Sequence, residues 1–189
     1  MSLLTAVLFA AALAGVQDPD APIVTGGSVR AAETAEALRV REALAYATPL
    51  PRGAPDGDYP LVAWCEALVT GHVAVGESLT NVDPLDDEII RLGKLEAADF
   101  RDALNVGRGR QTAATLAAAE AAATAARGLW TEVLANPDEA VRSQTFGLFF
   151  GLPGRCEHAA RRVRENITAA PATLKDAGLD DTGAPAGER

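Results

Sequence analysis

Two cysteines and two histidines are the residues in this chain best suited to chemistry. They fall in two pairs, Cys65 with His72 and Cys156 with His158. Two thiolates and two imidazoles can complete a tetrahedral zinc shell. However, His158 follows Cys156 by two residues, so on a helix it projects about 160° away from that cysteine. We therefore expect His158 to face solvent, and the sequence does not favour a metal site.

Both cysteines lie on apolar helical stripes and are expected to point inward. Cys65 shares its stripe with Leu61, Leu68, His72, Val75 and Leu79, and Cys156 shares its stripe with Ala160, Val163 and Ile167. Two inward-facing thiols in an oxidising compartment favour a disulfide. We predict a Cys65–Cys156 bridge, with separate buried thiols or a metal site as the alternatives.

His72 and Glu96 are further candidates for chemistry inside the predicted core. A core histidine that bonds one backbone carbonyl is the favoured interpretation of His72, while a ligand, proton-carrier or partner-contacting role stays open. Glu96 falls on the apolar stripe of its helix only if that helix continues through Gly93. A carboxylate there would have a raised pKa and could act as an acid or base. We favour a break at Gly93 that turns Glu96 outward, and with no nucleophile beside it the sequence argues against an enzyme.

A phenylalanine-rich segment, Phe146, Phe149 and Phe150, precedes an arginine-rich one. Core packing is the default interpretation of the phenylalanines, and a partly exposed partner groove is the alternative. Arg155 and Arg162 belong to a set of arginines spread around the polar arc of the last predicted helix. We expect a solvated face, with docking to an acidic partner or to anionic lipid as the alternative. Replacing both by Glu should then weaken binding and hardly change the melting temperature.

The N-terminal segment from Leu3 to Ala14 is an unbroken apolar run of about twelve residues, within the range of a signal-peptide h-region. A membrane span needs about twenty such residues. Ala12 and Ala14 supply a small-x-small cleavage site, so we expect removal of residues 1–14 on export from a bacterial cell. A buried N-terminal helix and an uncleaved anchor are the alternatives. The expected location is periplasmic or secreted, without a stable membrane span in the mature chain.

The composition indicates one helical domain. The chain has 189 residues and is 48% apolar but only 5% aromatic, so alanine, the best helix former, must supply much of the core. The formal charge is −9, with 26 acidic and 17 basic residues. This balance argues against nucleic-acid binding, because that requires a basic surface.

Apolar periodicity and capping signals predict six helices and no strand. Asp83 before Pro84 and Asn136 before Pro137 are the clearest helix starts, because Asp and Asn cap helices and proline suits the first turn. The predicted helices cover residues 29–47, 60–79, 84–104, 111–135, 137–151 and 155–168.

We therefore predict an all-α protein, a single compact bundle of about five to six helices with an alanine-rich core and one possible disulfide. The expected organisation is a signal peptide (1–14), a flexible leader with one loosely packed helix (15–59), a helical domain (60–168) and a disordered tail (169–189).

The expected function is that of an exported helical binding or interaction module with no catalytic site and no cofactor. Its partner would be another envelope protein, contacted through Phe146, Phe149, Phe150, Arg155 and Arg162. The alternative is a small-ligand or metal-binding bundle centred on His72, Cys65 and Glu96.

Overall fold

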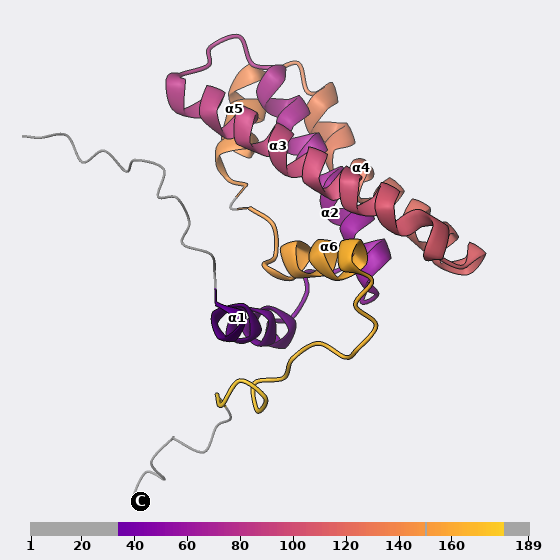
Figure 1. The fold of residues 1–189 in the computed structure, drawn as a ribbon. Helices are drawn as coiled ribbons and strands as arrows, with labels where there is room; N and C mark the ends of the chain where they lie inside the picture. The colour runs from indigo at the N-terminus through magenta and orange to yellow at the C-terminus, as the bar shows by residue number, and fades with distance from the viewer. Residues whose placement is uncertain (1–33, 150, 180–189) are drawn as a thin grey trace, which may run out of the picture. The chain divides into compact units, whose positions relative to one another are not determined.

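The computed structural model describes residues 34–149 and 151–179, which belong to one compact unit. In these ranges the chain forms six α-helices and one 3-10 helix and has no strand, which confirms the all-α prediction (Figure 1). None of the helices there is long and apolar enough to cross a bilayer. The predicted signal peptide, the first part of the leader, Phe150 and the end of the tail lie outside the described residues. The elements are α1 (Ala35–Ala47), α2 (Asp58–Glu77), α3 (Pro84–Gly107), η1 (Arg108–Arg110), α4 (Ala113–Ala135), α5 (Glu139–Gly147) and α6 (Arg155–Glu165).

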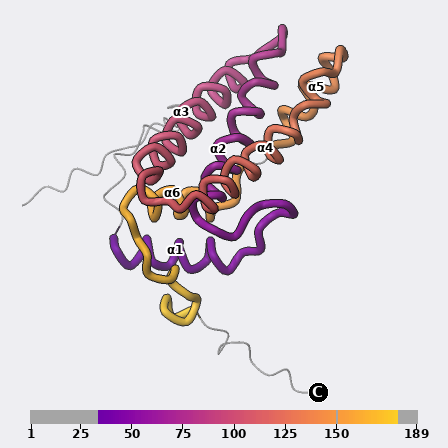
Figure 2. Tube along the Cα trace, turned by 90° about the vertical axis from the view of Figure 1, so that its right-hand side faces the viewer, coloured from indigo at the N-terminus to yellow at the C-terminus, as the bar shows by residue number. Residues whose placement is uncertain are grey.

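α2 is the central helix of the bundle. It is buried on almost every face, and Leu61, Val62, Cys65 and Val75 are all 0% exposed. α3 and α4 pack against it from two sides (Figure 2), and α5 and α6 also contact it. Their shared contact with α2 joins these four helices in one core.

α4 shows that alanine builds much of this core, as the composition predicts. Its buried residues are Ala119, Ala122, Ala123, Ala126 and Trp130. The large Trp130 ring needs an opening in α2, which Gly71 provides. A Cβ atom at Gly71 would lie only 1.9 Å from Cδ1 of Trp130, so a larger residue would overpack the contact.

α3 runs without interruption through Gly93, contrary to the favoured expectation of a break there. Gly93 is buried, and a Cβ atom at this position would lie 2.7 Å from Cγ2 of Val73. The glycine therefore allows α3 to approach α2 closely. Apolar periodicity places Leu85 and Leu92 on the inward face of this helix, and that expectation is wrong, because the two residues are 66% and 49% exposed.

Side-chain caps define where α3 and α5 begin. Asp83 caps α3 as predicted, and its Oδ1 accepts hydrogen bonds from the N–H groups of Leu85 (2.7 Å) and Asp86 (2.9 Å). For α5 the predicted cap, Asn136, is wrong by two residues. Asp138 caps α5, whereas Asn136 ends α4 and accepts a hydrogen bond from the Asp138 N–H at 2.9 Å.

α1 begins after Thr34, contacts α6 and buries Ala43 and Glu42, which are 1% and 8% exposed. At the other end of the described chain, the Asp176 carboxylate accepts hydrogen bonds from the N–H (2.9 Å) and hydroxyl (2.7 Å) of Thr173. The described part of the segment after residue 168 thus includes a hydrogen-bonded turn.

Candidate functional site

The predicted Cys65–Cys156 disulfide is present. The two Sγ atoms are 2.07 Å apart and the Cα atoms 6.1 Å apart. Cys65 lies in the first half of α2, and Cys156 lies in the first turn of α6. The bond therefore holds the start of α6 against α2.

An ion-pair network joins α1, the start of α2 and α6. Arg162 on α6 donates from Nε to Oδ2 of Asp58 (2.9 Å), from Nη1 to Oε1 of Glu42 (3.2 Å), and from Nη2 to the carbonyl oxygen of Ala169. Asp58 also accepts a hydrogen bond from the Tyr46 hydroxyl at 2.6 Å. The network thus ties the first residue of α2 to both neighbouring helices.

Arg162 is buried, so the expectation that it belongs to a solvated face is wrong. Its side chain is only 5% exposed. A helical wheel with one buried face places Arg162 outside, but α6 is covered on a second side by α1, which supplies Glu42. Arg162 thus lies on the polar side of the helical wheel and is nevertheless buried between α6 and α1.

Burial also changes the acid–base behaviour of the network. Burial first, and then the hydrogen bond to the Asp58 carboxylate, raise the pKa of Tyr46, so its hydroxyl stays a neutral donor. Burial alone lowers the pKa of Arg162, but the hydrogen bond to Asp58 and its charge outweigh burial, and the pKa is raised. Arg162 therefore remains a cation.

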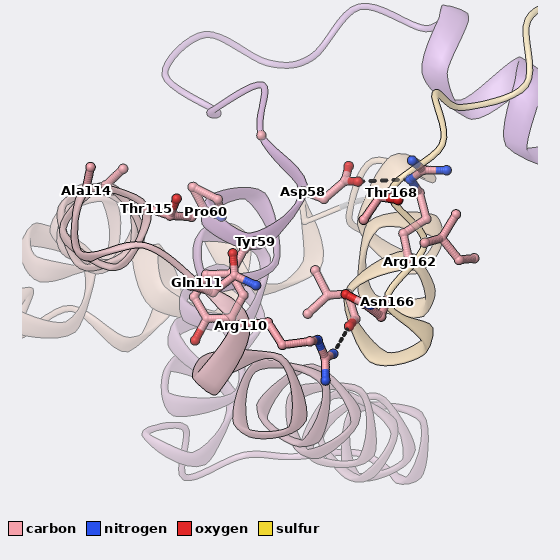
Figure 3. Close-up of a pocket in the computed structure, with 14 residues that line it drawn as sticks. Asp58, Tyr59, Pro60, Arg110, Gln111, Ala114, Thr115, Arg162, Asn166 and Thr168 are labelled. Atoms are coloured by element: carbon pink, nitrogen blue, oxygen red, sulfur yellow. Dashed lines mark hydrogen bonds and ion pairs between the residues drawn. The ribbon is translucent and has the colours of Figure 1, made fainter.

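A cavity of about 590 Å³, here called the polar groove, lies where the first turns of α2 and α4 meet the end of α6. Its walls are residues 57–60, parts of 110–118, and parts of 162–168. In Figure 3, Asp58, Arg162 and Thr168 lie on one side of the groove and Pro60 and Thr115 on the other. The buried ion-pair network thus forms one wall.

Arg110 connects the groove to the end of α6. Its Nη2 donates to the carbonyl oxygen of Val163 at 2.6 Å (Figure 3). α6 ends at Glu165, and its C-cap residue Asn166 has the left-handed φ of 56°. The last carbonyls of a helix have no partner within it, and Arg110 supplies a donor to one of them.

The groove can recognise a ligand through hydrogen bonds and charge. Gln111 and Thr115 offer an amide and a hydroxyl, and Asp58 and Arg162 offer opposite charges. Its described lining residues include no histidine or cysteine. These groups are available to form hydrogen bonds and ion pairs at the groove wall.

Arg155 packs on Tyr46 beside this network. Its guanidinium lies 4.5 Å from the centre of the Tyr46 ring, and its Nη2 donates to the carbonyl oxygen of Asp56 at 2.7 Å. Arg155 is only partly exposed. Its contacts fix the loop before α2, which is a structural role.

His72 belongs to an aromatic cluster and not to the groove lining. Its ring stacks on Phe146 and Phe149, with centroids 4.4 Å from each. Its Nε2 donates to the carbonyl oxygen of Phe146 at 3.0 Å, because a carbonyl can only accept. Burial lowers the pKa of His72 despite this hydrogen bond. The favoured interpretation, a core histidine with one backbone carbonyl, predicts this arrangement.

The phenylalanines pack largely inside the protein. Phe146 is 3% exposed, and Phe149 packs partly buried against the core, whereas Phe150 lies outside the described residues. The exposed side chain in this segment is Leu148, at 58%. Phe146 is therefore unavailable as a surface contact for a partner.

His158 is buried at 3% exposure, so the prediction that it faces solvent is wrong. The cause is again the second covering of α6 by α1, whose Arg41 and Glu42 are close enough to influence its pKa. Burial has the largest effect and lowers that pKa. Its Nδ1 is buried and has no hydrogen-bond partner among the described residues.

Glu96 is exposed although α3 is continuous, because the buried face of α3 runs through Gly93, Ala97 and Phe100. Partial burial first, and then the charges of Glu157 and Asp99, raise the pKa of Glu96. The structure does not unite Glu96 with Cys65, which is disulfide-bonded, or with His72. In the described ranges no group of three His, Cys, Asp or Glu residues could hold a metal ion.

Of the residues that line the groove, the sequence singles out Arg162 but not Asp58, Arg110 or Gln111. Asp58 is the first residue of α2, and Arg110 and Gln111 lie in the short connection between α3 and α4, where no motif is recognisable. These residues meet because three helix ends converge, and no spacing along the chain signals that. The one signal in the sequence is Arg110, a basic residue directly before the expected helix 111–135, and it does not by itself indicate a groove.

The fold and the groove together define a disulfide-linked helical bundle with a polar groove. A comparison with protein-family models finds no match. Comparisons with curated proteins and with solved structures find no match either.

Proposed function

We propose that this protein is an exported helical binding module and that the polar groove is where it binds another protein of the cell envelope. The observation that carries the proposal is the groove itself, a cavity of about 590 Å³ whose wall contains an ion pair between the buried Arg162 and the partly exposed Asp58. Ligand-binding clefts measure about 300–1,000 Å³, so the groove is large enough to receive a side chain or a short segment of a partner.

The buried network supports a role beyond stability. Removing charges from water costs several kcal/mol per ion, so a buried ion pair adds little to stability compared with apolar packing. Arg162 and Asp58 instead hold fixed charges and donors at the groove wall. Preorganised polar groups of this kind favour specific recognition.

Export is supported by the apolar run from Leu3 to Ala14 and by the disulfide. Disulfides persist in oxidising compartments and are rare in the cytosol. Phe146 is buried, which removes it from the partner surface and leaves the groove as the contact region.

Affinity capture from native envelopes, with the full chain expressed in its own host, tests the proposal. Ala118 is exposed and lines the groove, so Ala118→Arg should fill the groove without disturbing the core. Ala121 is exposed on the same helix outside the lining, which makes Ala121→Arg a matched control. Such surface changes alter stability by less than about 0.5 kcal/mol.

We expect one stoichiometric envelope protein to be recovered by the wild-type chain and by Ala118→Arg only in trace amounts. Recovery by Ala121→Arg should equal that of the wild type. Equal recovery by both variants would place the binding surface elsewhere, and recovery of no partner by the wild type would contradict the proposed function.

A further inference from the structure

A second cavity, of about 230 Å³, lies between α3 and α4 where both pack on α2. We name it the arginine hollow, after Arg101, Arg108 and Arg127 in its lining. Like the polar groove, it is lined by both polar and apolar side chains. The inference below does not depend on the function proposed for the groove.

The floor of the hollow is built from small and aromatic side chains. Ala63 on α2 and Ala119 and Ala123 on α4 are 6–7% exposed, and the ring of Tyr59 is 6% exposed. Because the three alanine side chains end at Cβ, they leave space where larger residues would fill the gap between the helices. The floor therefore offers an apolar surface to a compact ligand.

The rim carries one positive charge more than its carboxylates can pair. Arg101 Nε lies 3.3 Å from Oε1 of Glu66, and Arg127 Nη2 lies 2.8 Å from Oε1 of Glu120. The Arg108 guanidinium has no hydrogen bond or ion pair with any residue in the described part of the chain. It is thus available to an anion from outside.

The geometry points to a small monocarboxylate with an apolar body as the ligand. A guanidinium presents paired N–H donors that match a planar carboxylate, and the Asn105 amide also lines the hollow. A single unpaired cation neutralises one negative charge, which favours a carboxylate over a phosphate dianion. Drug-sized ligands occupy about 300–1,000 Å³, so this smaller hollow suits a compact acid that lies on Ala63, Ala119 and Ala123.

Benzoate is the probe that tests this inference, with the full oxidised chain observed by NMR of its alanine methyl groups. We expect benzoate to shift the methyl signals of Ala63, Ala119 and Ala123. Benzamide has the same ring without the charge, and acetate has the charge without the ring, so both should bind more weakly. Arg108→Gln removes the charged partner, which should weaken benzoate binding about tenfold or more.

Arg91→Gln is the matched control, since Arg91 is an exposed α3 arginine that pairs with Glu88 outside the hollow. It should leave benzoate binding unchanged. The inference is overturned if benzoate fails to bind, if benzamide binds equally well, or if Arg108→Gln has no effect. Shifts at Ala114 and Ala118 instead would place the acid in the polar groove and also overturn it. Ala118→Arg should not affect benzoate, so failure here is separable from failure of the groove proposal.

Discussion

Arg162 reaches two carboxylates and a backbone carbonyl from a single position on α6. Its burial makes it different from its neighbour Arg164, which pairs with Asp99 and Asp102 at the surface. Removing one partner of a buried pair leaves an uncompensated charge in the interior. The two arginines therefore have very different effects on stability, although the sequence presents them alike.

Arg162→Gln should lower the free energy of unfolding by about 3–5 kcal/mol, because Glu42 and Asp58 lose their buried partner. Arg164→Gln should lower it by no more than about 1 kcal/mol, as for other exposed pairs. Urea unfolding of both variants measures the difference. A loss of no more than about 1 kcal/mol for Arg162→Gln as well would show that Arg162 does not act as a buried charge.

The two buried histidines should make stability depend on pH. Burial lowers the pKa of His72 and of His158 in the folded state, so below about pH 6.5 the unfolded chain binds more protons than the folded one. The free energy of unfolding should therefore be flat above that pH and fall as the pH decreases below it. Glu96 acts in the opposite sense, because its pKa is raised.

Urea unfolding between pH 8 and pH 5 measures this effect, with a His72→Gln/His158→Gln double variant to isolate it from the carboxylates. The double variant should lose less stability on acidification than the wild type, and His72→Gln alone should cost about 1–3 kcal/mol at neutral pH. Parallel pH profiles for the wild type and the double variant would contradict the account.

At the residue scale, sequence reasoning succeeded where one face of one helix decides the outcome. Cys65 and Cys156 each lie on an apolar stripe of one helix. From the stripes alone we could predict that both side chains point inward and that they pair. It failed at His158 and Arg162, because burial there depends on α1, which is distant in sequence. A helical wheel describes only the element's own periodicity and not a second helix that covers it.

At the scale of the elements, α2 and α6 are held together by a covalent bond as well as by packing. The bridged cysteines are 91 residues apart in sequence. In the chain-entropy model, a loop of this length restricts the unfolded chain enough to contribute about 4–5 kcal/mol to stability.

Reduction of the disulfide should therefore lower the free energy of unfolding by a few kcal/mol. Thiol titration should find no free thiol in the oxidised protein, with or without a chelator. Two thiols released only by chelation would mean that a metal and not a bridge joins the cysteines. Unchanged stability after reduction would show that packing alone holds α6 in place.

Two helical glycines should respond in opposite directions to substitution by alanine. Gly71→Ala should destabilise the protein by about 1–3 kcal/mol, because the new Cβ would collide with the Trp130 ring. Gly128→Ala places its Cβ in open space on α4 and should stabilise by about 0.5–1 kcal/mol, since glycine is a poor helix former. Thermal unfolding compares the two, and equal shifts in melting temperature would contradict the Trp130 contact.

Helix starts could be predicted only where one cap dominates. Asp83 before Pro84 is unambiguous, but Asn136 and Asp138 both suit the cap position, and the chain uses the second to start α5. Gly93 was misjudged for a different reason. A glycine within a helix indicates either a break in the helix or close packing against a neighbouring helix. The structure shows close packing here, because Val73 of α2 lies directly against Gly93.

At the scale of the whole molecule, both cavities arise from the way helices converge on α2. The polar groove forms where three helix ends meet, and the arginine hollow forms where α3 and α4 flank α2. The sequence predicts a helical bundle with an alanine-rich core, which is confirmed. It contains no information on crossing positions, so neither cavity could be predicted.

Intact mass of the protein isolated from its native host, after alkylation without reduction, tests most directly the claim that this is an exported protein linked by a disulfide. The account predicts a chain that has lost residues 1–14 and carries no alkyl group on Cys65 or Cys156. A mature soluble chain that retains Met1, or one with both cysteines alkylated, would contradict it.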